Sequence, residues 1–432
     1  MAALRLLIAP IVVCSLLAAL PSGPGAAQAA DEPADSSPDL DARAWVLIDA
    51  RDGTTLAAHR VREELPIASL SKLMTAYLTL EELPLDREIK APAYDAAPAE
   101  SVLGLQAGER LSVRDLLVAM MLPSANDAAF TLADGVSGSR RSFIRKMNSA
   151  ARELGLEQTS YANPIGLDDP DNYSSAADLA ALATELLGDK RFAKIVAKPD
   201  ATLKSSDPPR RVETRNTLLL SDPSVVGVKT GHTNAAGYVL VAAAERHEVP
   251  LISVVLGTSS EAERDAASAE LLDYGFSLYE PREAVARGER LASAPVRYED
   301  RPLALVAGGS ERVRAREDQS IEVSYDAPGE LEGPIPGGER MGRALVLLDG
   351  ERVGAVPVLA GREIDAPDLL ARLGFEPAWL IVGGSILLLA VLAVVLRRAR
   401  QRRRRGPPQR TAEERISSRE HRARQREEGK QA

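Results

Sequence analysis

Patterns typical of β-strands occur at both ends of the first 275 residues, with helical patterns between them. Residues 44–49 and 54–59 flank Asp52-Gly53, a pair that favours a tight hairpin. Three more strand patterns close the region, at residues 225–229, 238–246 and 251–257. This order predicts an α+β domain, residues 43–276, whose antiparallel sheet joins both ends of the region and is flanked by helices.

The middle of this region has helical periodicity. After Pro66, apolar residues recur on one broad face of a predicted helix, and residues 262–274 form a predicted closing helix. Further helices are expected at residues 111–121, 126–136, 142–154 and 178–187. Ser175 and Asp178 predict a capping box at the start of the last of these.

Residues 277–370 have a different pattern, which predicts a small all-β domain. Short strands separated by Gly, Pro and Asp are expected at residues 296–298, 303–306, 320–325 and 344–359. Asp349-Gly350 indicates a hairpin within the last stretch. We find no evident chemistry in this domain.

The N-terminus is typical of a secretory signal peptide, residues 1–30. An apolar run from Leu6 to Leu20 precedes the small residues Ala27-Gln28-Ala29, where cleavage is expected. An anchoring helix is the less favoured alternative, because the run is short. Residues 31–42, rich in Asp, Pro and Ser, predict a disordered lead. Cys14 is the single cysteine, so no disulfide is expected after cleavage.

The C-terminus predicts a membrane anchor. Residues 378–396 contain no charge over 19 residues, which is long enough to cross a bilayer. The tail, residues 397–432, has 14 Lys/Arg and five Asp/Glu. Because positive flanks stay in the cytoplasm, we expect a single-pass protein with an extracytoplasmic body and a cytoplasmic tail.

The charge of the body argues against nucleic acid as a partner. The whole chain has a net charge of −9 and the tail contributes +9, so the rest carries −18. The basic tail is suited to anionic lipid, or is simply a flank that stops membrane transfer.

Lysine is scarce, with nine lysines against 44 arginines, and two of the nine lie in distinctive short motifs. Ser69-Leu70-Ser71-Lys72 comes first, Ser124-Ala125-Asn126 begins 55 residues after Ser69, and Lys229-Thr230-Gly231 begins 105 residues after Ser124. A lysine can lose its proton when it is desolvated, whereas arginine cannot. The three motifs therefore predict an activated-serine site.

Ser69 is the predicted nucleophile and Lys72 its base. We expect Ser69 to open a helix, so that Lys72, three residues later, shares its face. A lysine acts as a base only if its pKa falls from about 10.4 towards 7, and burial and the nearby charge of Lys229 both favour that. The alternative is a helix-capping serine followed by a solvated lysine.

The other two motifs are less specific alone. Ser124, after Pro123, is equally suited to capping the next helix. Lys229-Thr230-Gly231 ends a strand pattern, as an edge-strand clamp on a substrate would, and Gly231 permits close approach of a ligand backbone.

The three motifs in this order resemble those of the serine-type D-alanyl-D-alanine carboxypeptidases, the low-molecular-mass penicillin-binding proteins. The resemblance covers residues 40 to about 370. It is carried by residues 67–75, 122–128 and 227–233 around the motifs and by the loop 163–167. It implies a β-lactamase/transpeptidase-like domain followed by a β-rich domain.

The resemblance also implies a function in peptidoglycan biosynthesis and cell shape. The enzyme would remove the terminal D-alanine from stem pentapeptides through an acyl-enzyme, without a cofactor, and β-lactams would acylate Ser69. Lys72 would be the general base and Ser124 a proton relay, and Asn126 would bind the substrate amide. Lys229 and Thr230, with Gly231 beside them, would hold the terminal carboxylate. Backbone N–H groups of Ser69 and His232 would form the oxyanion hole.

Two positions depart from the family pattern. Ile165 stands where many relatives have histidine, and Ser259 lies near where some have an arginine that grips the carboxylate.

Three alternatives remain. One is DD-endopeptidase activity on cross-links, and another is a non-catalytic wall-binding protein. A β-lactamase is disfavoured because residues 155–175 contain only Glu157 and no Glu-x-x-Leu-Asn string. We expect no metal site, because the acidic run at 168–172 lacks the Gly and Glu of a calcium loop.

Overall fold

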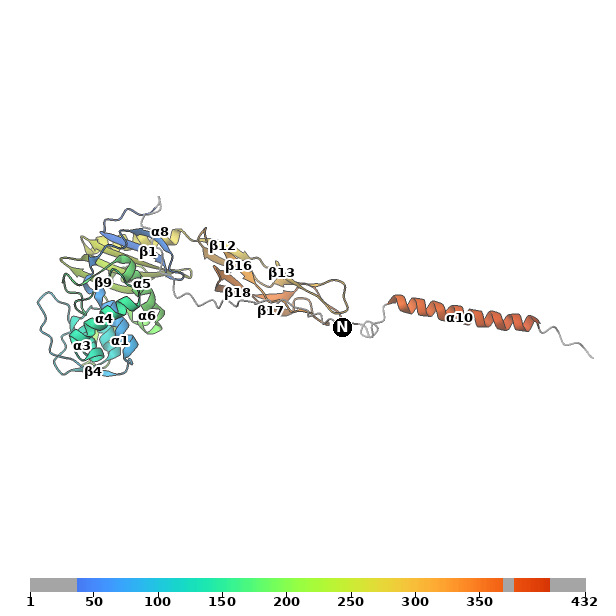
Figure 1. The fold of residues 1–432 in the computed structure, drawn as a ribbon, viewed down its shortest axis with the longest axis horizontal. Coiled ribbons are helices and arrows are strands. Elements are labelled where there is room, and N and C mark those ends of the chain that lie inside the picture. The colour runs from blue at the N-terminus through green and yellow to red at the C-terminus, as the bar shows by residue number, and fades with distance from the viewer. Residues whose placement is uncertain (1–36, 368–376, 405–432) are drawn as a thin grey trace, which may run out of the picture. The chain divides into compact units, whose positions relative to one another are not determined.

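The computed structural model describes residues 37–367 and 377–404 (Figure 1). They form two compact units: residues up to 282 together with 314–319, and residues 283–313 together with those from 320 onwards. The predicted signal peptide, the first part of the lead and the tail beyond residue 404 lie outside the described residues.

The first unit contains a five-stranded antiparallel sheet in the order β2-β1-β11-β10-β9. Its strands are β1 (Ala44–Asp49), β2 (Thr55–His59), β9 (Val225–Thr233), β10 (Gly237–Arg246) and β11 (Val249–Thr258). β1 pairs with β11, so the predicted joining of the two ends of the region is confirmed. β9, which carries Lys229-Thr230-Gly231, lies at the edge of the sheet.

Helices cover both faces of this sheet (Figure 1). The helices of this unit are η1 (Ala68–Ser71), α1 (Lys72–Glu82), α2 (Val113–Met121), α3 (Asn126–Ser137), α4 (Arg140–Glu153), α5 (Ala176–Gly188), α6 (Lys190–Val196), α7 (Thr217–Ser221) and α8 (Glu261–Ser277). Three short strand pairs complete the unit: β3 (Leu65–Pro66) with β6 (Tyr173–Ser174), β4 (Glu88–Lys90) with β5 (Arg110–Ser112), and β7 (Asp200–Leu203) with β8 (Arg210–Glu213).

β1 is buried on both faces, which explains its continuous apolar sequence. Trp45 and Leu47 pack in one cluster with Leu271 of α8, whereas Val46 and Ile48 belong to the larger cluster on the helical side. Because alternate residues of a strand point to opposite faces, one strand supplies both cores. Leu40 and Ala42, at the end of the predicted lead, pack against the α8 cluster.

The predicted helices are present with shifted ends. The helix expected from residue 111 begins at Val113, because Leu111 pairs with Ile89 of β4 and Ser112 caps the helix by accepting from the Asp115 backbone N–H. Ser175 accepts in the same way from the Asp178 backbone N–H, as the capping pattern predicts. The short strands, α6 and α7 were not predicted, because two to seven residues carry little periodicity.

The second unit is built mainly on a five-stranded antiparallel sheet in the order β13-β14-β18-β17-β16. The strands of this part of the chain are β12 (Glu280–Val285), β13 (Arg290–Ala294), β14 (Leu303–Ala307), β15 (Glu311–Ala315), β16 (Ile321–Ser324), β17 (Arg340–Leu348) and β18 (Glu351–Ala360). Asp349 and Gly350 both have positive φ between β17 and β18, which confirms the hairpin there. β12, β13 and β15 were not predicted.

One helix among the described residues, α10 (Pro377–Arg404), is long and apolar enough to cross a membrane, with a candidate span over Ile381–Arg402. It includes the uncharged stretch 378–396 and continues into the basic residues after it.

A buried ion pair lies in the first unit. Arg316, in the segment 314–319, donates to Asp49 Oδ2 at 2.8 Å, to the Tyr279 hydroxyl at 2.9 Å and to Asp52 Oδ2 at 3.1 Å. Asp49 has no exposed surface and Arg316 is 7% exposed. The Asp49 carboxylate also accepts from the Tyr279 hydroxyl and the Arg51 backbone N–H.

We predict that Arg316→Ala lowers the free energy of unfolding by about 3–5 kcal/mol, because it leaves the Asp49 carboxylate buried without its cation. Arg110→Ala is the control, since it breaks an exposed pair with Glu88 and is expected to cost less than about 1 kcal/mol. Denaturant unfolding of both variants measures this difference, and equal losses would contradict it.

Candidate active site

Ser69 lies in the 3₁₀ turn η1, and the regular helix α1 begins only at Lys72. Ser69 therefore lies at the start of a helix, as predicted, although this first turn is 3₁₀ and begins at Ala68. The preceding residue, Ala68, has φ +48°, a left-handed conformation that a regular helix excludes. Ser69 and Lys72 nevertheless share one side, because three residues complete one turn of a 3₁₀ helix.

The Lys72 amine is fully buried and has three acceptors. Nζ donates to Ser69 Oγ at 3.0 Å, to Asn126 Oδ1 at 2.7 Å and to the Ile165 carbonyl at 2.9 Å. An ammonium has three donors, so this shell satisfies the group completely. The alternative of a solvated lysine is wrong.

Burial lowers the pKa of Lys72 from 10.5 to about 7, and the charge of Glu100 opposes this effect. A base whose pKa lies near the working pH is half free at neutrality and still accepts a proton readily. The amine beside Ser69 therefore has the properties that an activating base needs.

Ser124 faces the second lysine. It has φ +65°, and its Oγ accepts from Lys229 Nζ at 3.0 Å. The N-cap of α3 is Ala125, without a side-chain capping bond, so the alternative that Ser124 caps this helix is wrong. Lys229 is 1% exposed, and burial followed by the charge of Lys72 lowers its pKa well below the usual value.

Asn126 connects the first two motifs. Its Oδ1 accepts from Lys72, and its Nδ2 donates to Glu100 Oε2 at 2.7 Å. Neighbouring Asp127 is 3% exposed and accepts backbone N–H groups from Leu103, Gly104 and Leu105. It holds the loop before α2 in place, a role that its position at a helix start did not indicate.

Two glycines lie against the Ser69 backbone. A Cβ on Gly231 would come within 2.9 Å of the Ser69 nitrogen, and one on Gly166 would come within 1.7 Å of the Ala68 carbonyl oxygen. Gly166 also has φ +88°. Only glycine at these positions allows β9 and the loop 163–167 to approach the turn that carries Ser69.

An open cleft of about 250 Å³ contains the reactive serine. Its lining residues come from several separate segments of the first unit: Ser69, Ala99, Ser101, Ser124, Arg215, Thr230, Gly231, His232, Tyr238, Glu261 and Arg264. His232 is exposed, and its ring lies 4.0 Å from that of Tyr238. Lys72, Asn126 and Lys229 lie behind this surface and act on it through Ser69 and Ser124.

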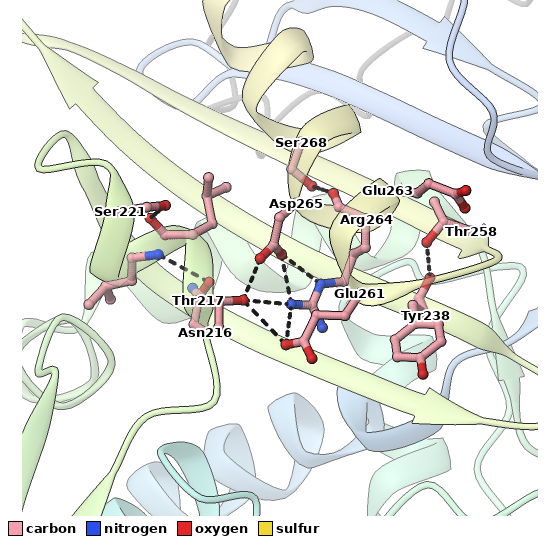
Figure 2. Close-up of polar contacts among 12 residues, drawn as sticks. Asn216, Thr217, Ser221, Tyr238, Thr258, Glu261, Glu263, Arg264, Asp265 and Ser268 are labelled. Carbon is pink, nitrogen blue, oxygen red and sulfur yellow. Dashed lines mark hydrogen bonds and ion pairs between the residues drawn. The ribbon is translucent and has the colours of Figure 1, made fainter.

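Arg264 is a cleft residue that the sequence motifs did not identify. Figure 2 shows its guanidinium held between Glu261 and Asp265 of α8 and Thr217 of α7. The side chain is only 4% exposed. Arg264 lies on the same buried face of α8 as Ser268, Leu271 and Gly275. A charged residue on the buried face of a predicted helix is the sequence feature that could have identified it.

The two departures from the family pattern have structural explanations. Ile165 contributes its backbone carbonyl to Lys72, a contact that does not depend on the side chain. Ser259 donates to Glu263 and does not line the cleft, whereas Arg264, five residues later, does. The cleft thus contains an arginine despite the serine at 259.

Two family models match the chain. A model described as D-alanyl-D-alanine carboxypeptidase matches residues 30–260, and one described as Penicillin-binding protein 5, C-terminal domain, matches residues 279–366. With the fold and the serine–lysine site, these matches define a serine peptidase with a penicillin-binding-protein fold.

Individual relatives agree. D-alanyl-D-alanine carboxypeptidase DacC of Escherichia coli is 32% identical, over 78% of this chain and 88% of the relative, and DacF of Bacillus subtilis is 30% identical, over 75% and 86%. The solved structure of penicillin-binding protein 5 from Haemophilus influenzae is 28% identical, with a TM-score of 0.54, and covers 77% of this chain and 100% of that one. The Streptomyces K15 DD-transpeptidase is 31% identical, with a TM-score of 0.54, and covers 56% and 100%. The chain belongs to the D-alanyl-D-alanine carboxypeptidase family.

We predict that Gly166→Ala lowers the rate of Ser69 acylation by on the order of 100-fold, because the new Cβ must displace the Ala68–Ser69 backbone by about 1 Å or more. Gly155→Ala is a matched control: Gly155 also has positive φ, +72°, but a Cβ there meets nothing within 4 Å. Acylation by a fluorescent penicillin measures both. Equal rates for the two variants would contradict the role of close backbone approach.

Proposed function

We propose that this chain hydrolyses the terminal D-Ala–D-Ala bond of peptidoglycan stem peptides with Ser69 as the nucleophile. The contact that carries the proposal is the 3.0 Å hydrogen bond from the buried Lys72 amine, with its pKa lowered to about 7, to Ser69 Oγ. β-Lactams acylate the same oxygen. The family match supports both the reaction and the substrate class.

Acylation begins when neutral Lys72 takes the Ser69 proton and Oγ attacks the carbonyl carbon of the scissile bond. The carbonyl oxygen becomes an oxyanion that accepts from the backbone N–H groups of Ser69 and His232. Gly166 and Gly231 allow these donors to converge, since any larger residue would displace the Ser69 backbone.

The leaving D-alanine needs a proton on its amine. Ser124 lines the cleft and accepts from Lys229, so its hydroxyl can pass a proton to the leaving nitrogen and regain one from the lysines behind it. Water then attacks the acyl-enzyme with Lys72 as base again, which releases the shortened peptide and restores the Ser69 hydroxyl. Asn126 already bonds Lys72 and Glu100, so it binds the substrate amide only through a shared hydrogen bond.

The terminal carboxylate of the substrate binds at the Thr230 end of the cleft. Thr230 and Arg264 both line it, and Arg264 is fixed by its neighbours before substrate arrives (Figure 2). A preorganised guanidinium is suited to a carboxylate. Lys229 adds positive charge from behind Ser124 rather than direct contact.

The proposed location is outside the cytoplasmic membrane. A signal peptide at residues 1–30 exports the chain, α10 anchors it, and the basic tail stays in the cytoplasm. The length and composition of α10 support the anchor. There the enzyme trims peptidoglycan and so affects cell shape.

Intact-mass analysis tests this function directly. The protein is mixed with penicillin and, separately, with a pentapeptide ending in D-Ala–D-Ala. An adduct on Ser69 with release of D-alanine supports the carboxypeptidase. An adduct without release favours endopeptidase or cross-linking activity. If neither an adduct nor D-alanine release were observed, the chain would be a wall-binding protein without catalytic activity.

We predict that Ser69→Ala abolishes the penicillin adduct and that Lys72→Arg is nearly as damaging, because a guanidinium stays protonated and cannot accept the serine proton. The measurement is the acylation rate. If Lys72→Arg lost less than about tenfold, a different base would be operating.

We predict that Arg264→Gln lowers kcat/KM roughly 10- to 100-fold for a peptide with a free C-terminal carboxylate, the value of a charged hydrogen bond of about 1.5–3 kcal/mol. The same peptide with a C-terminal amide should lose little further activity. Arg152→Gln, on the exposed face of α4, is the control variant. Equal losses on both peptides would show that Arg264 does not read the carboxylate.

A further inference from the structure

Glu100 is a carboxylate next to the reactive lysine that neither the sequence motifs nor the proposed mechanism uses. It lies in the long loop between β4 and β5, and three donors fix it. Oε2 accepts from Asn126 Nδ2 at 2.7 Å and from the Tyr94 hydroxyl, and Oε1 accepts from the Ala97 backbone N–H at 3.0 Å.

The bond from Asn126 determines which way its amide points. With Nδ2 directed at Glu100, Oδ1 faces Lys72 and accepts from Nζ at 2.7 Å. The reversed amide would place an N–H group against the lysine and its oxygen against a carboxylate, and both contacts would be repulsive. Tyr94, Glu100, Asn126, Lys72 and Ser69 therefore form one continuous hydrogen-bonded chain.

We propose that Glu100 is a positioning residue for the reaction: through Asn126 it holds the Lys72 amine against Ser69, and its negative charge balances the cations around that amine. This inference rests on the proposed role of Lys72 as the base. It assigns a function to the loop between β4 and β5, where Ala99 and Ser101, on either side of Glu100, line the cleft.

The charges around Lys72 support the proposal that the negative charge of Glu100 balances the cations near the amine. Burial is the largest effect and lowers its pKa, whereas the charge of Glu100 is next and raises it. Arg215, before α7, lowers the pKa, and Asp127 of α3 raises it. The charge of Lys72 in turn lowers the pKa of Lys229 of β9. Without Glu100, burial and the cations would leave a more weakly basic amine.

Glu100 remains ionised at neutral pH. Burial raises its pKa, but the hydrogen bonds from Tyr94, Asn126 and the Ala97 backbone outweigh that effect and hold it below the usual value. A permanent charge beside a titrating amine changes the pH at which the amine becomes free, which a purely structural residue does not.

Acylation needs neutral Lys72, so its rate rises with pH through the pKa of that amine, about 7 in the native protein. Glu100→Gln removes the charge that raises this pKa. The rising limb of the profile should therefore move to lower pH, by roughly one unit or more for a carboxylate this close.

The experiment measures the second-order rate of Ser69 acylation by a fluorescent penicillin from pH 4 to 9 on the full chain, with the melting temperature as a check on folding. Glu88→Gln is the matched control, since Glu88 is an exposed glutamate paired with Arg110. The expected result is a limb moved to lower pH in Glu100→Gln alone. An unmoved limb, or one moved to higher pH, would overturn the electrostatic role.

Tyr94→Phe tests the positioning role separately. It removes one donor to Glu100 but keeps the charge and the ring that packs 4.9 Å from Phe130. The plateau rate should fall several-fold while the limb stays in place. An unchanged plateau rate would overturn the positioning role. If the rising limb moved to lower pH as in Glu100→Gln, the loss of the Glu100 charge would not be the cause of that shift, because Tyr94→Phe keeps the charge.

These outcomes separate this inference from the proposed function. If the native protein and Glu88→Gln are not acylated on Ser69, the proposed function itself fails and the inference fails with it. If both are acylated with a limb near pH 7 and Glu100→Gln matches them, only the inference fails.

Discussion

The burial of the Lys72 amine is the constraint on which the rest of the site depends. An ammonium in a protein interior is costly unless every donor finds an acceptor, and burial instead favours its neutral form. Here Ser69, Asn126 and the Ile165 carbonyl supply three acceptors from three different segments. The burial that is costly for the fold also lowers the pKa of the amine, so that it acts as a base at neutral pH.

This shell explains why segments far apart in the chain must meet. Four segments surround the Ser69–Lys72 site: the turn η1, the start of α3, the loop 163–167 and the edge strand β9. They meet because β1 pairs with β11, which brings the two ends of the region into one sheet and leaves β9 at an edge against η1. Gly166 and Gly231 determine how closely the loop 163–167 and β9 approach η1.

Positive and negative charges are arranged around this buried pair of lysines in two layers. Arg264 and Arg215 line the cleft, where a substrate carboxylate is proposed to bind. Glu100 and Asp127 lie behind it, one bonded to Asn126 and the other to backbone N–H groups of the neighbouring loop. The carboxylates raise the pKa of Lys72 and so oppose the lowering caused by burial and Arg215.

The sequence by itself determined the α+β order, the reactive serine, its lysine and the edge strand with Lys229, because periodicity and short motifs are local properties. It did not determine that Ser69 lies in a 3₁₀ turn, that Ser124 faces Lys229 rather than capping α3, or that Glu100 and Arg264 join the site. The side-chain contacts of Glu100, Arg264 and Ser124 that place them there span 26 to 105 positions of sequence. Only the packing of the sheet against its helices decided which of the many charged residues face the buried amine, because electrostatic effects follow distance in space.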